Sequence, residues 1–230
     1  MKIFALDSTA TVASVALCED GKLLGEYTLM GGNTHSETLL PMVESLLNIF
    51  SIDTGDIDLF AASAGPGSFT GVRIGAATIK GLAFGTNKPC LGVSTLEALA
   101  YNLNCINGLI CPVMNARRKQ VYTALFRASN GRLTRLMDDS AIAIAELDEK
   151  LKQFEDPVRL CGDGYDITKE LLTHPIIPVS ERYRHQSAFS VAEVALQKYQ
   201  SGDVGTDLNL SPVYLRLSQA ERERKEAGLL

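Results

Sequence analysis

The order of strands and helices predicted along the chain constrains its fold most, because the same order occurs twice. Alternating apolar positions, helical spacing and turn residues predict these elements. The first half gives strands at 2–6, 12–17, 23–29, 57–63 and 89–93, and helices at 38–50, about 72–85 and 96–103. The second half gives strands at 109–116, 120–128, 132–137, 158–162 and 176–180, and helices at 145–154, 165–172 and 190–199. In both halves, three strands precede the first helix, and strands and helices then alternate.

This repetition favours two similar α/β lobes over one continuous domain. We expect a first lobe over residues 1–104 and a second, smaller lobe over residues 105–230. Each lobe should contain a mixed sheet flanked by helices. The length of 230 residues and the hydrophobic fraction of 46% are sufficient for two such cores.

The start of the first helix has two interpretations. Thr34 and Glu37 have the spacing of a capping box, but a helix beginning there would contain Pro41 in its interior. A start at Thr38 places Pro41 in the first turn, where its missing N–H costs nothing. We therefore expect the regular helix to begin at Thr38.

Charge and cysteine content exclude several classes of protein. The 22 basic and 27 acidic side chains give a net charge of −5, which is unfavourable for nucleic-acid binding by the chain alone. The five cysteines form no CxxC pair, so neither a zinc ribbon nor a thioredoxin motif is indicated. Asp7 interrupts the apolar N-terminus, and no apolar run reaches the length of a membrane-spanning helix. We expect a cytoplasmic protein that does not interact with membranes.

A glycine-rich stretch, GPGSFTGVRIG at residues 65–75, joins a predicted strand to a predicted helix. It lacks the Gly-Lys-Ser/Thr ending of a P-loop and the spacing of a dinucleotide fingerprint. Its glycines permit close backbone approach, and the helix N-terminus can receive an anion. A phosphate-binding loop and a tightly packed corner are both consistent with this pattern. We expect Arg73, in the first helical turn, to have an acidic or anionic neighbour.

A polar turn near the N-terminus, Asp7-Ser8-Thr9, is the second candidate motif. In sugar kinases, actins and chaperone ATPases, a similar hairpin carries an acid that holds a metal or water. The same residues also simply satisfy a turn. The candidate nucleotide contacts are Asp7, Ser8, Thr9, Gly65, Gly67 and Ser68.

Two helices of the first lobe have faces that suit helix–helix contact. The apolar face of 38–50 and the small-residue face of 72–85 form either a joint surface for a partner or the cover of their own sheet. The candidate partner contacts are Leu39, Met42, Val43, Leu46, Arg73, Gly75, Thr78 and Leu82.

Signatures of catalysis and metal binding are missing from the sequence. The three histidines form neither HExxH nor HxxxH, and no paired carboxylates or GxSxG motif are present. We therefore assign no catalytic residue and no metal ligand. Asp163 lies between two glycines. This pattern is consistent with a contact to an adenosine and with a simple turn.

Five segments together resemble the bacterial TsaB family of tRNA threonylcarbamoyladenosine biosynthesis proteins, also called YeaZ. They are ALDSTATVASVAL, THSETLLPMV, GPGSFTGVRIGAATIKGLAFG, LGVSTLEALA and PVYLR, and the resemblance runs from residue 2 to about 216. It implies the two-lobed acetate and sugar kinase/Hsp70/actin fold, which agrees with the two predicted lobes.

The resemblance further implies a non-catalytic paralogue of TsaD, the subunit that transfers threonylcarbamoyl to N6 of a tRNA adenosine next to the anticodon. TsaD carries a metal-binding HxxxH, and the matching positions here are Thr95 and Leu99. The glycine turn of the second lobe is replaced by bulkier residues at 115–118. The scaffold is thus retained, while the residues of the reaction centre are absent.

The same resemblance implies the partners. In this family, the two first-lobe helices pack against TsaD, the ATPase TsaE joins the assembly, and isolated members form homodimers through the same helices. Transfer RNA would be reached indirectly through the complex. No cofactor is required by this chain, although ATP or ADP binding is left open, and the basic segment from Arg222 to Lys225 is a solvated end or a partner contact.

Two other functions are consistent with parts of the sequence. A small-molecule kinase or ATPase would use Asp7 and the cleft of the same fold. A metalloprotease, an old label of the wider family, requires a histidine pair that this chain lacks.

Overall fold

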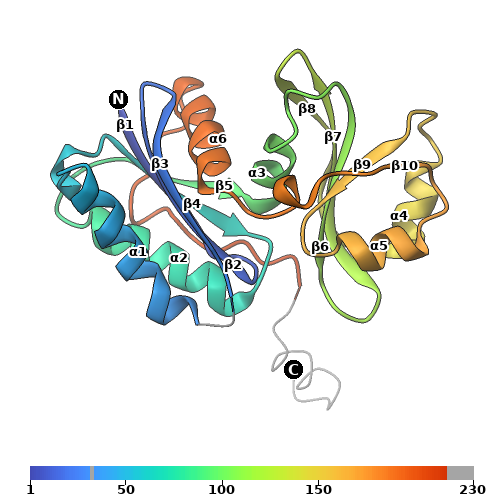
Figure 1. Ribbon diagram of the computed structural model, residues 1–230, viewed down its shortest axis with the longest axis horizontal. Coiled ribbons are helices and arrows are strands. Elements are labelled where there is room, and N and C mark those ends of the chain that lie inside the picture. The colour runs from blue at the N-terminus through green and yellow to red at the C-terminus, as the bar shows by residue number, and fades with distance from the viewer. Residues whose placement is uncertain (32–33, 217–230) are drawn as a thin grey trace.

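Two five-stranded sheets lie side by side in the computed structural model, which describes residues 1–31 and 34–216 (Figure 1). The basic segment from Arg222 to Lys225 lies outside the described residues. The predicted order of strands and helices is confirmed in both halves of the chain.

The first half forms β1 (Lys2–Asp7), β2 (Val12–Glu19), β3 (Lys22–Met30), α1 (His35–Ile49), β4 (Leu59–Gly65), α2 (Phe69–Ala83), β5 (Cys90–Ser94) and α3 (Thr95–Tyr101). The second half forms β6 (Gly108–Asn115), β7 (Gln120–Ser129), β8 (Arg132–Ala143), α4 (Ile144–Leu151), β9 (Val158–Cys161), α5 (Tyr165–Leu171), β10 (Ile176–Ile177) and α6 (Ala188–Gln200). Short 3₁₀ helices occupy Thr54–Asp56 and Glu181–Tyr183.

The two sheets have equivalent topologies. The first sheet has the order β3-β2-β1-β4-β5, and the second has the order β8-β7-β6-β9-β10. In each sheet the first strand pairs antiparallel with the second strand and parallel with the fourth. This duplicated arrangement confirms the predicted two-lobed acetate and sugar kinase/Hsp70/actin-like fold.

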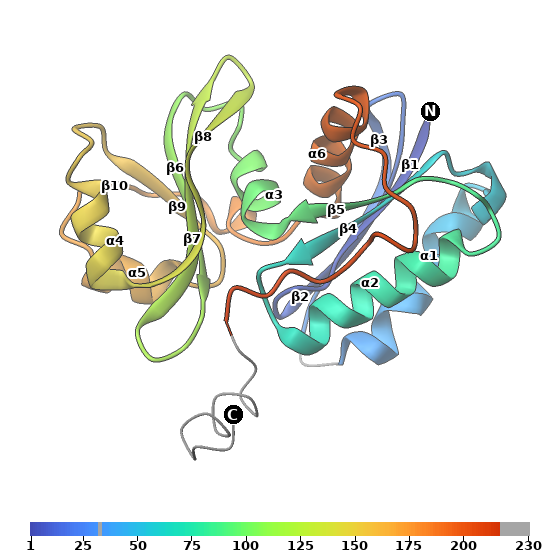
Figure 2. The same ribbon diagram turned by 180° about the vertical axis from the view of Figure 1, so that it is seen from behind.

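Helices cover both faces of each sheet, and the last helix of each half packs on the other half. In the first lobe, α1 and α2 cover one face of the sheet, and α6 covers the opposite face (Figures 1 and 2). In the second lobe, α4 and α5 cover one face, while α3 packs on the other. Helices α3 and α6 therefore tie the lobes together, and the expected division at residues 104 and 105 stays a prediction.

A C-terminal strap, residues 203–216, returns along the first lobe after α6 (Figure 2). The Cys90 N–H donates to the Gly205 carbonyl at 3.0 Å, and the Val213 N–H donates to the Ala64 carbonyl at 2.7 Å. Leu210 is buried in the core beneath α1 and α2. The strap reaches the second lobe at Leu215, which packs against that lobe's core.

The beginnings of α1 and α2 differ from the expected ones. Helix α1 starts at His35, with the Thr34 N–H bonded to the Glu37 carboxylate at 3.4 Å, so the start expected at Thr38 is wrong. Pro41 lies inside the helix on an exposed position, where water can satisfy the carbonyl that it leaves without a donor. The apolar residues of the next turns hold this segment against the sheet and outweigh the lost hydrogen bond.

Helix α2 begins at Phe69, three residues before the expected start. The Ser68 hydroxyl caps it by accepting from the Gly71 N–H at 3.3 Å. Arg73 is therefore not in the first turn, and the expected conflict with the helix dipole does not arise. Its described partner is a phenol instead of an acid, since its Nε donates to the Tyr214 hydroxyl at 2.7 Å.

The candidate partner contacts divide into buried and accessible groups. Leu39, Val43 and Leu46 are each 1% exposed and pack against the sheet. These three side chains cover their own lobe, which is one of the two uses that the sequence left open. Met42, Thr78 and Leu82 are half-buried, Gly75 is buried, and Arg73 is exposed.

Two leucines of α1 provide a test of this orientation. Replacing the buried Leu46 by Ala should lower the free energy of unfolding by about 2–5 kcal/mol, because a cavity remains in the core. The same change at Leu40, which is 51% exposed, should cost less than about 1 kcal/mol. Urea unfolding followed by circular dichroism measures both values. Equal losses for the two variants would contradict the described orientation of α1.

Candidate functional site: the cleft between the lobes

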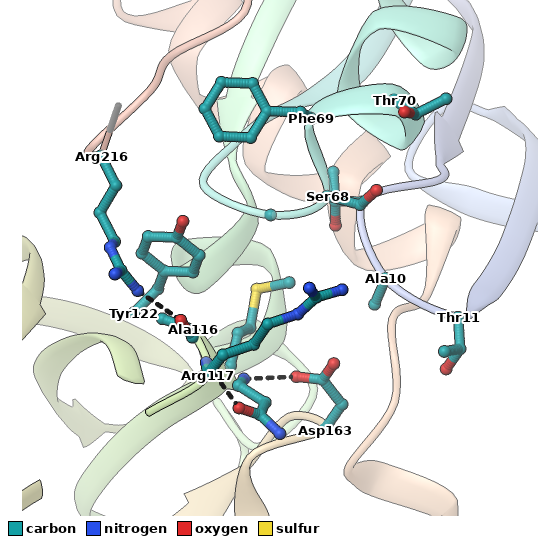
Figure 3. A pocket seen from close by; sticks show the side chains of 14 residues that line it. Ala10, Thr11, Ser68, Phe69, Thr70, Ala116, Arg117, Tyr122, Asp163 and Arg216 are labelled. Carbon is teal, nitrogen blue, oxygen red and sulfur yellow. Dashed lines mark hydrogen bonds between the residues drawn. The ribbon is translucent and has the colours of Figure 1, made fainter. Parts of the chain in front are cut away.

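A cleft of about 610 Å³ separates the two lobes. The first lobe contributes the β1–β2 turn and the start of α2, and the second lobe contributes the β6–β7 turn (Figure 3). The lining residues are Thr9, Ala10, Thr11, Gly67, Ser68, Phe69, Thr70, Met114, Asn115, Ala116, Arg117, Tyr122, Asp163 and Arg216. Of the predicted nucleotide contacts, Thr9, Gly67 and Ser68 line this cleft, whereas Asp7, Ser8 and Gly65 do not.

Asp7 lies beneath the β1–β2 turn and is 1% exposed. Its carboxylate accepts hydrogen bonds from the Thr9 N–H at 2.8 Å, from the Thr9 hydroxyl at 2.7 Å and from the Ser63 hydroxyl. Burial raises the pKa of this carboxyl above its ordinary value, and these hydrogen bonds partly oppose the shift. The carboxylate thus shapes the turn and is not among the groups that line the cleft.

The glycine loop packs directly on the β1–β2 turn. The Ser68 N–H donates to the Thr9 carbonyl at 2.7 Å, and the Ser8 hydroxyl donates to the Gly71 carbonyl at 2.9 Å. A Cβ atom added at Gly67 would lie 2.4 Å from the Thr9 carbonyl oxygen, and one at Gly71 would lie 2.0 Å from that of Ser8. Because no side chain fits in these positions, the loop is a close-packed corner.

The α1 helix contacts the same turn. The His35 ring donates from Nε2 to the Ala10 carbonyl at 2.6 Å. Ala10 also packs against the core of the second lobe. The β1–β2 turn is therefore a junction of both outer helices, the cleft and the second lobe.

On the opposite wall, the β6–β7 turn presents cations instead of glycines. Arg117, Arg118 and Lys119 have φ angles of 64°, 53° and 55°, values that glycine adopts most easily. Hydrogen bonds between Ala116 and Gln120 and between Gln120 and Arg117, at 3.0 and 3.1 Å, hold the turn in this shape. The bulkier residues predicted to replace a glycine turn thus keep a glycine-like backbone.

Asp163 closes the floor of the cleft next to this turn. Its carboxylate accepts from the Asn115 N–H at 3.0 Å, and desolvation by the surrounding chain raises the pKa of the carboxyl, although the side chain still reaches solvent. Because this backbone contact orients the β6–β7 turn, the Asp163 side chain has a structural role in addition to facing the cleft.

The end of the C-terminal strap forms the third side of the cleft mouth. The Tyr214 ring stacks on Phe69 with ring centroids 4.5 Å apart, and the hydroxyl of Tyr214 accepts from Arg73. Two residues later, Arg216 donates to the Ala116 carbonyl and so connects the strap to the second lobe (Figure 3). Sequence reasoning missed Arg117, Tyr122 and Arg216 as cleft residues, although the PVYLR segment was already a signal for the last of them.

Thr95 and Leu99, which the family resemblance matches to two histidines of TsaD, lie in α3. Thr95 and Leu99 are both buried in the interface between the lobes. Among the described residues, no group of three or more histidine, cysteine or acidic side chains has an arrangement suited to a metal ion. In the same part of the chain, no helix combines the length and the hydrophobicity needed to cross a membrane.

A second surface lies on the outer side of α2. Thr70, Arg73, Ala77, Gly81 and Phe84 follow one another along the helix at spacings of three or four residues, and all are exposed. Phe84 is 79% exposed, and a Cβ added at Gly81 would meet no atom within 4 Å. The neighbouring α1 leaves Leu40 and Ile49 exposed. This α2 outer stripe has small residues in its middle, Ala77 and Gly81, and an exposed aromatic side chain at its end, Phe84.

The duplicated sheets and the cleft between them define a two-lobed protein of the actin-like class. Comparisons with known proteins specify it further. The family model described as TsaD, tRNA N6-adenosine threonylcarbamoyltransferase, matches residues 30–222. The tRNA threonylcarbamoyladenosine biosynthesis protein TsaB of Bacillus subtilis (strain 168) is 33% identical over 96% of this chain and 96% of its own length.

The TsaB protein of Escherichia coli (strain K12) is 30% identical over 94% of this chain and 95% of its own length. The solved structure of YeaZ from Pseudomonas aeruginosa matches with a TM-score of 0.81 and 25% identity, over 93% of this chain and 99% of that one. The chain belongs to the TsaB (YeaZ) family of tRNA threonylcarbamoyladenosine biosynthesis proteins.

Two glycines of α2 distinguish the packed corner from the open stripe. Gly71→Ala should destabilise the fold by several kcal/mol, on the order of 3, because its Cβ would overlap a backbone oxygen. Gly81→Ala should stabilise the fold by about 0.5–1 kcal/mol, because alanine is the better helix former and the site is open. Thermal and urea unfolding of the two variants measure the contrast. A tolerated Gly71→Ala would refute the packed corner.

Proposed function

We propose that this chain is a non-catalytic component of a tRNA threonylcarbamoyladenosine-forming complex, in which it binds and organises the catalytic subunit TsaD, with TsaE as a further partner. The observation that carries the proposal is the α2 outer stripe. Small exposed residues such as Ala77 and Gly81 allow the backbone of a partner helix to come close, and Phe84 adds an exposed aromatic anchor.

The small and apolar residues in the middle and at the end of this stripe favour a lasting protein contact. Leu40 and Ile49 of α1 are also exposed, but at nine residues apart they lie on opposite sides of that helix, so one of them at most borders α2. Clustered apolar side chains on a water-exposed helix pair are unusual on a monomer and mark interaction sites. The same surface would serve a homodimer when the chain is isolated, because a two-fold axis pairs a patch with itself.

The chemistry of the cleft favours an organising role over a catalytic one. The Asp7 carboxylate already accepts three hydrogen bonds, is 1% exposed and does not line the cleft. The positions that hold metal in TsaD carry Thr95 and Leu99, and a leucine cannot be a ligand. A kinase or ATPase of this fold would instead turn over nucleotide when isolated, and we expect this chain to show no such turnover.

Gly81→Glu tests the proposed partner surface. The glutamate would occupy open space on the free chain, so the fold should keep its stability, but its charge would be buried against a helical partner. We expect binding to purified TsaD to weaken at least tenfold, a change of about 1.4 kcal/mol. Isothermal titration calorimetry with both full-length proteins measures the dissociation constant.

The matched control is Gln200→Glu, which makes the same charge change at an exposed position near the end of α6, a helix on the opposite face of the first sheet. This variant should bind TsaD as the unaltered chain does. If a folded Gly81→Glu variant retained full affinity, or if both variants lost affinity equally, α2 would not be the partner surface.

A further inference from the structure

Cationic side chains gather at the mouth of the cleft, although the chain as a whole carries a net charge of −5. Arg117 and Arg216 line the cleft from the second lobe and from the strap. Lys119 is exposed in the same turn as Arg117. Arg73 of α2 bonds to Tyr214 of the same strap, two residues before Arg216. The local charge of the cleft mouth is thus opposite to that of the whole chain.

The Arg117 guanidinium extends into the cleft (Figure 3). The Arg117 backbone N–H donates to the Asn115 side chain at 2.8 Å, and its carbonyl accepts from Gln120 within the turn. In the described structure these are its only hydrogen bonds, and neither involves the guanidinium. Among the described residues, no carboxylate pairs with its guanidinium. The left-handed turn that carries this arginine is fixed by the Asn115–Asp163 contact. Arg117, with no carboxylate partner in the described part of the chain, is therefore displayed from a well-defined support.

Arg216 reaches the cleft from the other direction. Its guanidinium uses one N–H for the Ala116 carbonyl and has further donors to offer. The stacking of Tyr214 on Phe69 fixes the strap just before this residue. Two guanidinium groups on separate supports therefore face one cleft.

The opposing negative charge is small. Among the described lining residues, Asp163 is the one carboxylate, and its Oδ1 already accepts from the Asn115 N–H at 3.0 Å. The exposed polar groups of the first-lobe wall are the hydroxyls of Thr11, Ser68 and Thr70, whereas the Thr9 hydroxyl is buried and donates to Asp7. Guanidinium groups and hydroxyls are the side-chain donors that most often contact phosphate oxygens.

We propose that this cleft mouth binds the phosphodiester backbone of RNA, in direct contact with the tRNA on which the complex acts. The inference rests on the proposed function for the choice of RNA. Exposed residues on both walls form an open groove along which a strand can pass. Asp7 is buried and does not line the cleft, so its carboxylate is not presented to the metal that accompanies a free nucleoside triphosphate.

Fluorescence anisotropy with a labelled tRNA anticodon stem-loop tests the proposal on the full chain. The double variant Arg117→Gln/Arg216→Gln removes two charges and leaves a shorter side chain that still has an amide donor. We expect its RNA affinity at low salt to fall about tenfold or more. The slope of log K against log salt should decrease by about 1 for each arginine removed. The control is Lys22→Gln, which removes one exposed cation at the opposite end of β2 and β3. Its RNA affinity should stay within about twofold of that of the unaltered chain.

Four results would overturn the proposal. The first is no RNA binding by the unaltered chain at low salt, the second is an unchanged salt slope in the double variant, and the third is an equal loss in Lys22→Gln. Competition by unlabelled ADP or pyrophosphate as effectively, per phosphate, as by RNA would also overturn it in favour of a free-nucleotide site. Asp163→Asn, which removes the opposing charge and keeps an acceptor for Asn115, should tighten RNA binding.

Failure of this inference is separable from failure of the proposed function. The double variant should bind TsaD with unaltered affinity, because neither arginine lies on α2. Gly81→Glu should bind the isolated stem-loop as the unaltered chain does. Loss of RNA binding without loss of TsaD binding therefore reports on the cleft alone.

Discussion

The backbone contact between the β1–β2 turn and the first turns of α2 determines much of this structure. The carbonyl oxygen of Ser8 occupies the space that a side chain at Gly71 would need, and the Thr9 carbonyl does the same at Gly67. Two hydrogen bonds link the same segments, from Ser68 to Thr9 and from Ser8 to Gly71. This contact buries Asp7, fixes the direction of α2 and builds one wall of the cleft. The glycine loop that resembled a phosphate-binding motif is thus explained first by packing.

The direction of α2 connects the two surfaces to which we assign functions. Its N-terminal residues Ser68 and Thr70 line the cleft, and its outer stripe continues through Ala77 and Gly81 to Phe84. The strap adds a second connection, because Tyr214 contacts Phe69 and Arg73 of α2, whereas Arg216 contacts the second lobe. A partner on α2 and a ligand in the cleft would therefore contact the same rigid helix. The duplicated lobes provide the support, and the cations of the β6–β7 turn give the cleft its charge.

The sequence predicted the order of elements and the fold because hydrophobic periodicity and turn residues are local signals. The start of α1 was not predicted, because Pro41 outweighed the capping residues in local reasoning, whereas tertiary packing holds the helix through Pro41. Hydrophobic periodicity also does not tell whether an apolar helix face is covered by the chain's own sheet or by a partner protein. Leu39, Val43 and Leu46 therefore read equally well as partner contacts or as core, and the structure places them in the core.

The cleft was harder to anticipate, because its walls come from segments far apart in sequence. Arg117 and Arg216 are separated by nearly the whole second lobe and meet only because the strap returns after α6. The exchange of α3 and α6 between the lobes is a tertiary feature that no local pattern records. Among the predicted nucleotide contacts, the burial of Asp7 follows from the turn above it and not from residue type.

Site-specific photo-crosslinking tests the central claim, that α2 presents its outer stripe to TsaD, most directly. A photoreactive amino acid at position 77, in the middle of the stripe, should crosslink to TsaD when the two full-length proteins are mixed. The same group at position 150, on α4 of the second lobe, should not crosslink. Crosslinks from position 150, or a stable complex that gives none from position 77, would contradict the account.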